Sequence, residues 1–116
     1  NLVKNGILLV AEAANMPCSQ DAVDLFIEND ILFGPAKAVN AGGVGVSGLE
    51  MSQNSARIAW ESDHLAKLLE DMMEDIHASC VEFGKGPNGS SVNYLKGANI
   101  AGFVKVADAM LAYGHV

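Results

Sequence analysis

The chain has 116 residues, of which 50% are hydrophobic and 18% are charged, so we expect a packed globular core and not a disordered chain. Its net charge of -7 argues against a nucleic-acid-binding protein, because phosphate binding needs clustered lysines and arginines. The sequence shows neither an apolar run of about 18 residues nor a signal-peptide pattern, so we expect no membrane span and a cytoplasmic location.

The first part of the sequence predicts a β-α-β unit. Residues 7–11 (ILLVA) are a continuous apolar run, which is typical of a fully buried parallel strand. Ser19 offers an N-cap for a helix whose apolar residues recur at three- and four-residue spacing. A turn at residues 29–30 leads to a second short strand at residues 31–33. Such units make parallel sheets, and because two strands would leave both edges open, we expect the end of a larger sheet.

A glycine-rich segment follows the second strand. Residues 40–43 (NAGG) contain too much glycine for regular structure, so we expect the next helix to begin at Val44 or Ser47 and to reach about Trp60. Residues 43–48 (GVGVSG) match the G-x-G-x-x-G pattern of a dinucleotide-binding turn. We reject that interpretation, because the pattern requires a further strand after its helix, and an amphipathic helix follows here. The glycines are expected to allow close approach of the backbone, to a ligand as well.

Two further helices are predicted in the second half of the chain. One begins at residues 62–63 and carries a long apolar stripe to Phe83. Residues 85–91 are rich in Gly, Pro, Asn and Ser and predict an exposed loop. The last helix ends at Gly114. We expect one face of it to be formed by apolar residues, namely Ile100, Phe103, Val104, Ala107, Met110 and Leu111.

Few side chains indicate chemistry by themselves. Ser47 lies near a predicted helix start, where a hydroxyl and free backbone N–H groups suit a carboxylate. An ordinary helix cap is the alternative, and spacing alone favours the cap. The three histidines lack metal-ligand spacing. Cys18 and Cys80 form no CxxC pair and have no base beside them, which favours reduced, unreactive thiols. These patterns predict an α/β fragment with a glycine-lined ligand site.

Three stretches of the sequence, taken together, resemble the glutamate dehydrogenase family. Residues 12–17 (EAANMP) are similar to the E-G-A-N-M-P segment of that family. Residues 40–54 (NAGGVGVSGLEMSQN) resemble its glycine-rich turn and helix, and residues 97–110 (GANIAGFVKVADAM) its C-terminal helix. Their order and spacing fit as well, so the resemblance covers essentially the whole chain. Ala13 and Ala36 stand where glycine is usual, but neither change removes a contact that the resemblance implies.

The resemblance implies ligand contacts for four side chains. Asn15, after the first strand, and Asn40, after the second, match residues that contact the nicotinamide–ribose end of the cofactor. Ser47 matches the serine that binds the side-chain carboxylate of glutamate or 2-oxoglutarate, and Val44 matches the residue that packs on the substrate's aliphatic chain. The chemistry agrees, because amides bind carboxamides and ribose hydroxyls, and a serine can bind a carboxylate. The catalytic lysine and aspartate of the family belong to an N-terminal half that is absent from this sequence.

The resemblance also implies the nature of the parent protein. It would be a homohexameric oxidoreductase that interconverts L-glutamate and 2-oxoglutarate plus ammonium. NADP is the preferred cofactor, with NAD as the alternative, because residues 76–82 (IHASCVE) look most like the NADP-using branch. A sibling dehydrogenase that acts on leucine, valine or phenylalanine is a rival, and Ser47 counts against it because those substrates lack a second carboxylate. A non-catalytic interaction module is the rival from another class.

The chain itself is expected to be the C-terminal portion of that parent. It opens with Asn1 and not with a methionine, which favours an internal boundary or a processed end. Residues 1–91 would be the C-terminal part of a Rossmann-like dinucleotide-binding domain. Residues 92–116 would form a helical tail that packs on the absent catalytic domain. We therefore expect the chain to be inactive alone.

Overall fold

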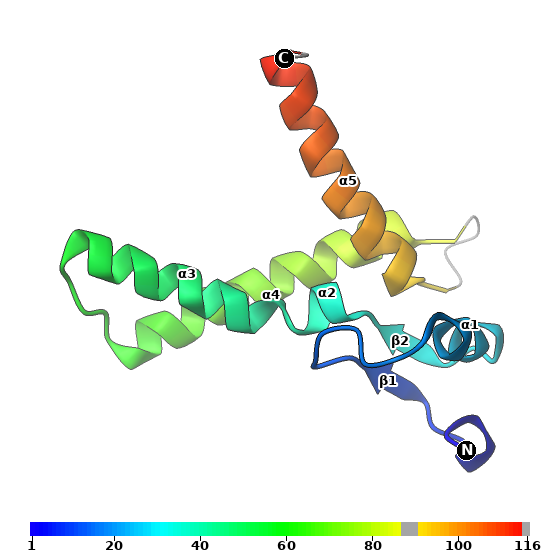
Figure 1. Ribbon diagram of the computed structural model, residues 1–116. Coiled ribbons are helices and arrows are strands. Elements are labelled where there is room, and N and C mark those ends of the chain that lie inside the picture. Colours follow the sequence, from blue (N-terminus) through cyan, green and yellow to red (C-terminus); the bar gives the residue numbers. More distant parts are fainter. Residues whose placement is uncertain (87–90, 115–116) are drawn as a thin grey trace.

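The two predicted strands form a parallel sheet with a helix between them. In the computed structural model, which describes residues 1–86 and 91–114, β1 (Leu9–Ala11) pairs in parallel with β2 (Leu32–Gly34). A single 3-10 turn, η1 (Val3–Asn5), precedes β1. Helix α1 (Gln20–Glu28) connects the strands, as Figure 1 shows, so the predicted β-α-β unit is confirmed.

Helix α1 packs on one face of the sheet because its apolar residues share one side. Ser19 caps it, and the Ser19 hydroxyl accepts a hydrogen bond from the N–H of Ala22 at 3.4 Å. Val23 and Phe26 are buried in a core cluster with Phe33 of β2. The rings of Phe26 and Phe33 stack with their centroids 6.1 Å apart. This cluster fixes α1 against the sheet, as the helical spacing of the sequence predicts.

The full burial expected for the first strand is not realised in this chain. Leu8 is 85% exposed and Leu9 of β1 is 54% exposed. A parallel strand is buried when helices cover both faces of its sheet and strands flank it on both sides. Here β1 has β2 as its one strand neighbour among the described residues, and the core cluster lies on the α1 side. That the sheet is the end of a larger one stays a prediction.

The glycine-rich segment is helical, contrary to the sequence-based expectation. Helices α2 (Ala36–Val39) and α3 (Ala41–Ala56) follow β2, with Asn40 between them. Helix α3 thus begins inside the NAGG segment, before either of the two starts that were expected. It also ends before Trp60, at Arg57, whose φ of 56° is left-handed.

Two of the glycines in α3, Gly42 and Gly45, pack closely on the next helix. Helix α4 (Ser62–Gly84) starts where the sequence predicts, and α3 packs on it. A Cβ at Gly45 would overlap the sulfur of Met72, and one at Gly42 would lie 3.3 Å from Cδ1 of Leu69. This packing outweighs the low helix propensity of glycine, about 1 kcal/mol per residue. The G-x-G-x-x-G run therefore lies inside a helix, and residues 57–61 between α3 and α4 form no strand, so its rejection as a dinucleotide-binding turn is confirmed.

The last helix begins at a capping asparagine and ends at a glycine. Helix α5 (Tyr94–Tyr113) is capped by Asn93, whose side chain accepts the N–H of Lys96 at 2.9 Å, and it ends at Gly114 as predicted. An antiparallel bridge between Lys85 and Val92 joins the ends of the α4–α5 connection. Residues 87–90 of the predicted loop lie outside the described residues. No helix in the described ranges combines the length and the apolar character that crossing a bilayer requires.

Helices α4 and α5 meet backbone to backbone near the start of α5. Gly97 of α5 and Cys80 of α4 are both buried at this crossing. A Cβ on Gly97 would overlap the carbonyl oxygen of Cys80 and lie 2.8 Å from its carbonyl carbon. The position therefore requires a residue without a side chain, since real atoms do not approach so closely.

Beyond this crossing α5 extends away from the rest of the chain (Figure 1). The apolar face expected on this helix is not covered: Phe103 is 72% exposed and Leu111 is 82% exposed, whereas Ile100 and Val104 are half-buried. A large apolar side chain that stays in water forgoes about 1.5–3 kcal/mol of burial.

We expect the 116-residue chain, produced alone, to self-associate through α5. Burial of Phe103 and Leu111 against a second copy provides the driving force. Sedimentation velocity over a concentration series measures the association, and the double substitution Phe103→Lys, Leu111→Lys should shift the chain towards the monomer. A monomer at high concentration with an ordered α5 would contradict the prediction.

Candidate functional site

The loops that leave β1 and β2 meet at the carboxyl edge of the sheet and line one groove. Its volume is about 550 Å³, which is within the range of small-molecule sites. Open α/β sheets bind their ligands at this edge, because the loops after neighbouring parallel strands converge there. Glu12, Asn15 and Cys18 come from the loop after β1, Ala36, Lys37 and Asn40 follow β2, and Leu95 and Asn99 come from α5.

A buried carboxylate joins the two loops. Glu12 is 6% exposed, and its Oε1 accepts the backbone N–H of Cys18 at 3.1 Å. Its Oε2 accepts the N–H of Ala36, the first residue of α2, at 2.9 Å. Sequence reasoning gave Glu12 no role of its own. The available signal was an acid directly after an apolar strand, where a charge needs partners if the chain around it is buried.

The structure brings the two predicted asparagines into this groove. Asn15 is exposed in the loop after β1, and Asn40 lies between α2 and α3. The Nδ2 of Asn40 donates to the carbonyl oxygen of Ala14 at 3.2 Å, so the segment after β2 also holds the loop that carries Asn15. One amide hydrogen of Asn40 is used in this bond, and its other hydrogen and Oδ1 are available for a ligand. Their contact with a cofactor stays a prediction.

The two predicted substrate-binding residues lie elsewhere. Val44 is 75% exposed on α3, and Ser47, one turn further, is exposed as well, but neither lines the groove. The expected setting of Ser47 needs correction. Because α3 begins at Ala41, the N–H of Ser47 lies inside the helix and not among the free groups at its start. The Ser47 hydroxyl does not cap the helix either, since it donates to the carbonyl oxygen of Gly43 at 3.2 Å. Substrate binding by these two residues stays a prediction.

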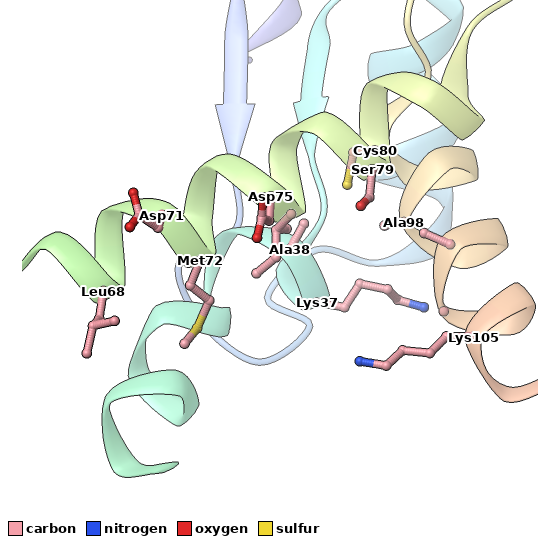
Figure 2. Close-up of a pocket in the computed structure, with 13 residues that line it drawn as sticks. Lys37, Ala38, Leu68, Asp71, Met72, Asp75, Ser79, Cys80, Ala98 and Lys105 are labelled. Carbon is pink, nitrogen blue, oxygen red and sulfur yellow. The ribbon is translucent and has the colours of Figure 1, made fainter. Parts of the chain in front are cut away.

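A second, larger groove lies between α2, α4 and α5 (Figure 2). Lys37 and Lys105 extend into it from α2 and α5, while Asp71 and Asp75 come from α4. Two of these charged groups have partners on the protein: Lys37 donates to Oδ1 of Asn99, and Asp71 pairs with Lys67 at 2.9 Å. The described residues contain no cluster of His, Cys, Asp and Glu that could hold a metal ion.

Neither cysteine has the environment of a nucleophile. Both are free thiols, as predicted. Burial raises the pKa of the Cys80 thiol. Burial also raises the pKa of Cys18, and the carboxylate of Glu12 adds to this effect. A raised pKa keeps each group as the thiol at neutral pH, and only the thiolate is nucleophilic.

Known proteins resemble this chain over its whole length. The NADP-specific glutamate dehydrogenase of Salmonella typhimurium is 58% identical over 115 residues, which are 99% of this chain and 25% of that protein. The NAD-specific glutamate dehydrogenase of Bacteroides fragilis is 52% identical over 116 residues, 100% of this chain and 26% of that protein. The chain thus spans about a quarter of the length of the curated relatives that it matches.

The fold agrees with these relatives. The crystal structure of Plasmodium falciparum glutamate dehydrogenase superposes with a TM-score of 0.92 at 43% identity, and the match covers 99% of this chain and 25% of that one. The family described as Glutamate/Leucine/Phenylalanine/Valine dehydrogenase matches residues 1–114. Sequence and fold agree over nearly every residue, and the chain belongs to the glutamate/leucine/phenylalanine/valine dehydrogenase family.

Proposed function

We propose that this chain is the C-terminal part of a glutamate dehydrogenase, which interconverts L-glutamate and 2-oxoglutarate plus ammonium with NADP as its preferred cofactor. One observation carries the proposal. Asn15 and Asn40, which follow different strands, line a single groove at the carboxyl edge of the sheet, in a chain that is 58% identical to an NADP-specific glutamate dehydrogenase. NAD is the alternative cofactor, since an NAD-specific glutamate dehydrogenase is 52% identical to the chain.

The groove suits the nicotinamide end of a dinucleotide. Asn15 and Asn40 provide amide donors and acceptors for a carboxamide or for ribose hydroxyls. The described residues offer no glycine-rich turn between a strand and a helix for the pyrophosphate, because the glycines of residues 43–48 are inside α3. When bound, the nicotinamide would accept or donate the hydride. The residues of this chain would bind and orient it.

The substrate would lie against α3. In this proposal Ser47 donates a hydrogen bond to the distal carboxylate of glutamate, and Val44 contacts its aliphatic chain. Both side chains are exposed on one face of the helix, at i and i+3, so a ligand can reach them together. The Ser47 hydroxyl would turn its proton from the Gly43 carbonyl to the carboxylate.

The rest of the parent would supply the catalytic residues. We propose that residues 1–91 belong to a Rossmann-like dinucleotide-binding domain and that residues 92–116 form a tail on a catalytic domain outside this sequence. The exposed apolar residues of α5 support this division, since they offer a surface for such a domain. The parent would be a cytoplasmic homohexamer.

Kinetics of the full-length protein test the proposal. Amino-acid-dependent reduction of NADP and of NAD is measured with glutamate, leucine, valine and phenylalanine. We expect kcat/KM to be highest for glutamate, and higher with NADP than with NAD. A preference for an apolar amino acid would show that the parent is a sibling dehydrogenase and not a glutamate dehydrogenase. An absence of turnover with every substrate would favour an interaction module.

The 116-residue chain alone is expected to show no glutamate-dependent reduction of NADP or NAD at any pH. The groove and the exposed face of α3 would bind parts of the ligands, but the catalytic lysine and aspartate implied by the family lie outside this sequence. The increase of reduced-cofactor absorbance with a purified chain, compared with buffer, measures this. Turnover above that background would contradict the prediction.

A further inference from the structure

We propose that Glu12 is a positioning residue for the cofactor groove, whose buried carboxylate fixes the two segments that carry Asn15 and Asn40. The inference rests on the proposed function, because it deepens the role that the two asparagines have there. Glu12 itself would act through these amides, so the effect of losing it depends on their presence.

The first argument is how completely the carboxylate is used. Each of its oxygens accepts one backbone N–H, from Cys18 at 3.1 Å and from Ala36 at 2.9 Å, and the residue is 6% exposed. Burial of a charge requires such compensation, and bonds from N–H groups to a carboxylate are stronger than neutral ones. No lysine or arginine pairs with Glu12 among the described residues. Backbone N–H donors therefore stabilise the buried charge, and the carboxylate in turn fixes the two backbone segments that carry these donors.

The second argument is where these bonds lie along the chain. Glu12 and Cys18 are the two ends of the loop that carries Asn15, so the bond to Cys18 closes this loop on itself. The bond to Ala36 ties the same side chain to the start of α2, which leads directly to Asn40. The Glu12 N–H also donates to the carbonyl oxygen of Gly34 at 3.0 Å.

The third argument is that a further hydrogen bond connects the two asparagine-bearing segments to each other. Asn40 donates to the carbonyl oxygen of Ala14, next to Asn15, at 3.2 Å. Loosening the Glu12 bonds therefore shifts both asparagines together. Misplacement of a binding group by about 1 Å is enough to cost up to a hundred-fold in rate, so this small set of bonds has a measurable effect on the cofactor.

The test uses the full-length protein and the variant Glu12→Gln. The amide nearly keeps the shape of the side chain, but it turns an NH2 group towards one of the two N–H donors. We expect the KM for NADP to rise by about tenfold, while the KM for glutamate stays within about twofold. The matched control is Glu28→Gln, which removes an exposed acid at the end of α1 and should change neither constant.

A second variant approaches the same bond from its donor. Ala36→Pro removes the N–H that Oε2 accepts while keeping the backbone conformation, since proline suits the first position of a helix, and it adds two ring carbons at a side chain that is 7% exposed. The preceding residue, Pro35, has φ -71° and ψ 149°, a conformation that is compatible with a following proline. We expect the same selective rise in the KM for NADP, and if Glu12→Gln does not fold, Ala36→Pro decides.

The background Asn15→Ala, Asn40→Ala separates this inference from the proposed function. In this background the KM for NADP should already be raised, and adding Glu12→Gln should change it by less than about twofold, since no amide is left to position. If the background variant keeps the wild-type KM for NADP, the proposed cofactor role of the asparagines fails. If it raises that KM but Glu12→Gln behaves like Glu28→Gln, or adds its full effect to the background, Glu12 is not a positioning residue.

Discussion

In the full-length protein, Ser47→Ala is expected to lower kcat/KM for glutamate by about ten- to a hundred-fold. A hydrogen bond to a charged group contributes about 1.5–3 kcal/mol, and the substitution leaves the distal carboxylate short of one donor. The hydroxyl is exposed on α3 and its proton is directed at the Gly43 carbonyl, a weak partner that already belongs to the helix. Exchange of this partner for a carboxylate is therefore favourable.

Norvaline, which has no distal carboxylate, is the comparison substrate. Its weak turnover should fall much less, because it never makes the bond. Ser52→Ala is the matched control, since the Ser52 hydroxyl donates to the carbonyl of Gly48 at 2.9 Å in the same way and on the same helix. Equal losses for norvaline and glutamate, or an equal loss in Ser52→Ala, would show that the serine acts on the helix and not on the substrate.

Gly97→Ala is expected to destabilise the protein by about 1–3 kcal/mol or more. The added methyl group overlaps the carbonyl oxygen of Cys80, and the obstacle is backbone, which cannot rotate away as a side chain does. Alanine gains up to about 1 kcal/mol over glycine in a helix, so the steric clash decides the sign. Denaturant unfolding of the full-length protein, followed by circular dichroism, measures the change in the free energy of unfolding.

Gly102→Ala provides the control on the same helix. Among the described residues nothing lies within 4 Å of a Cβ at this position, so in the 116-residue chain the helix propensity acts alone and stability should stay the same or rise slightly. If both substitutions change stability with the same sign and size, the crossing of α4 and α5 does not have the tight geometry described above.

Local signals account for the parts of the fold that the sequence predicts. The Ser19 cap, the apolar spacing of α1 and the Gly114 end of α5 each involve residues close in sequence. The start of α3 is missed because Gly42 and Gly45 pack on Leu69 and Met72 of α4, which are distant in sequence. Burial of β1 is overestimated for a related reason, since cover for an apolar surface depends on what else packs there.

The residues of the candidate site also differ in how far the sequence predicts them. The family resemblance, and not the residue pattern, singled out Asn15 and Asn40, and the structure then places them in one groove. Glu12 was missed because its position after an apolar strand does not show which backbone groups it will bind, and those groups belong to two loops that meet only in the folded chain. The helical setting of Ser47 was missed together with the start of α3.

A small change of angle where Gly97 crosses Cys80 would cause a large displacement at the far end of α5. At 1.5 Å of rise per residue, the helix from Gly97 to Tyr113 is about 24 Å long. A tilt of roughly 10° at the crossing would therefore move its far end by about 4 Å, which is close to the width of a side chain. Where side chains meet, a change of rotamer can accommodate a small shift between two helices. Main-chain atoms in contact cannot adjust in this way. The direction of α5 is therefore most sensitive to the main-chain contact at Gly97.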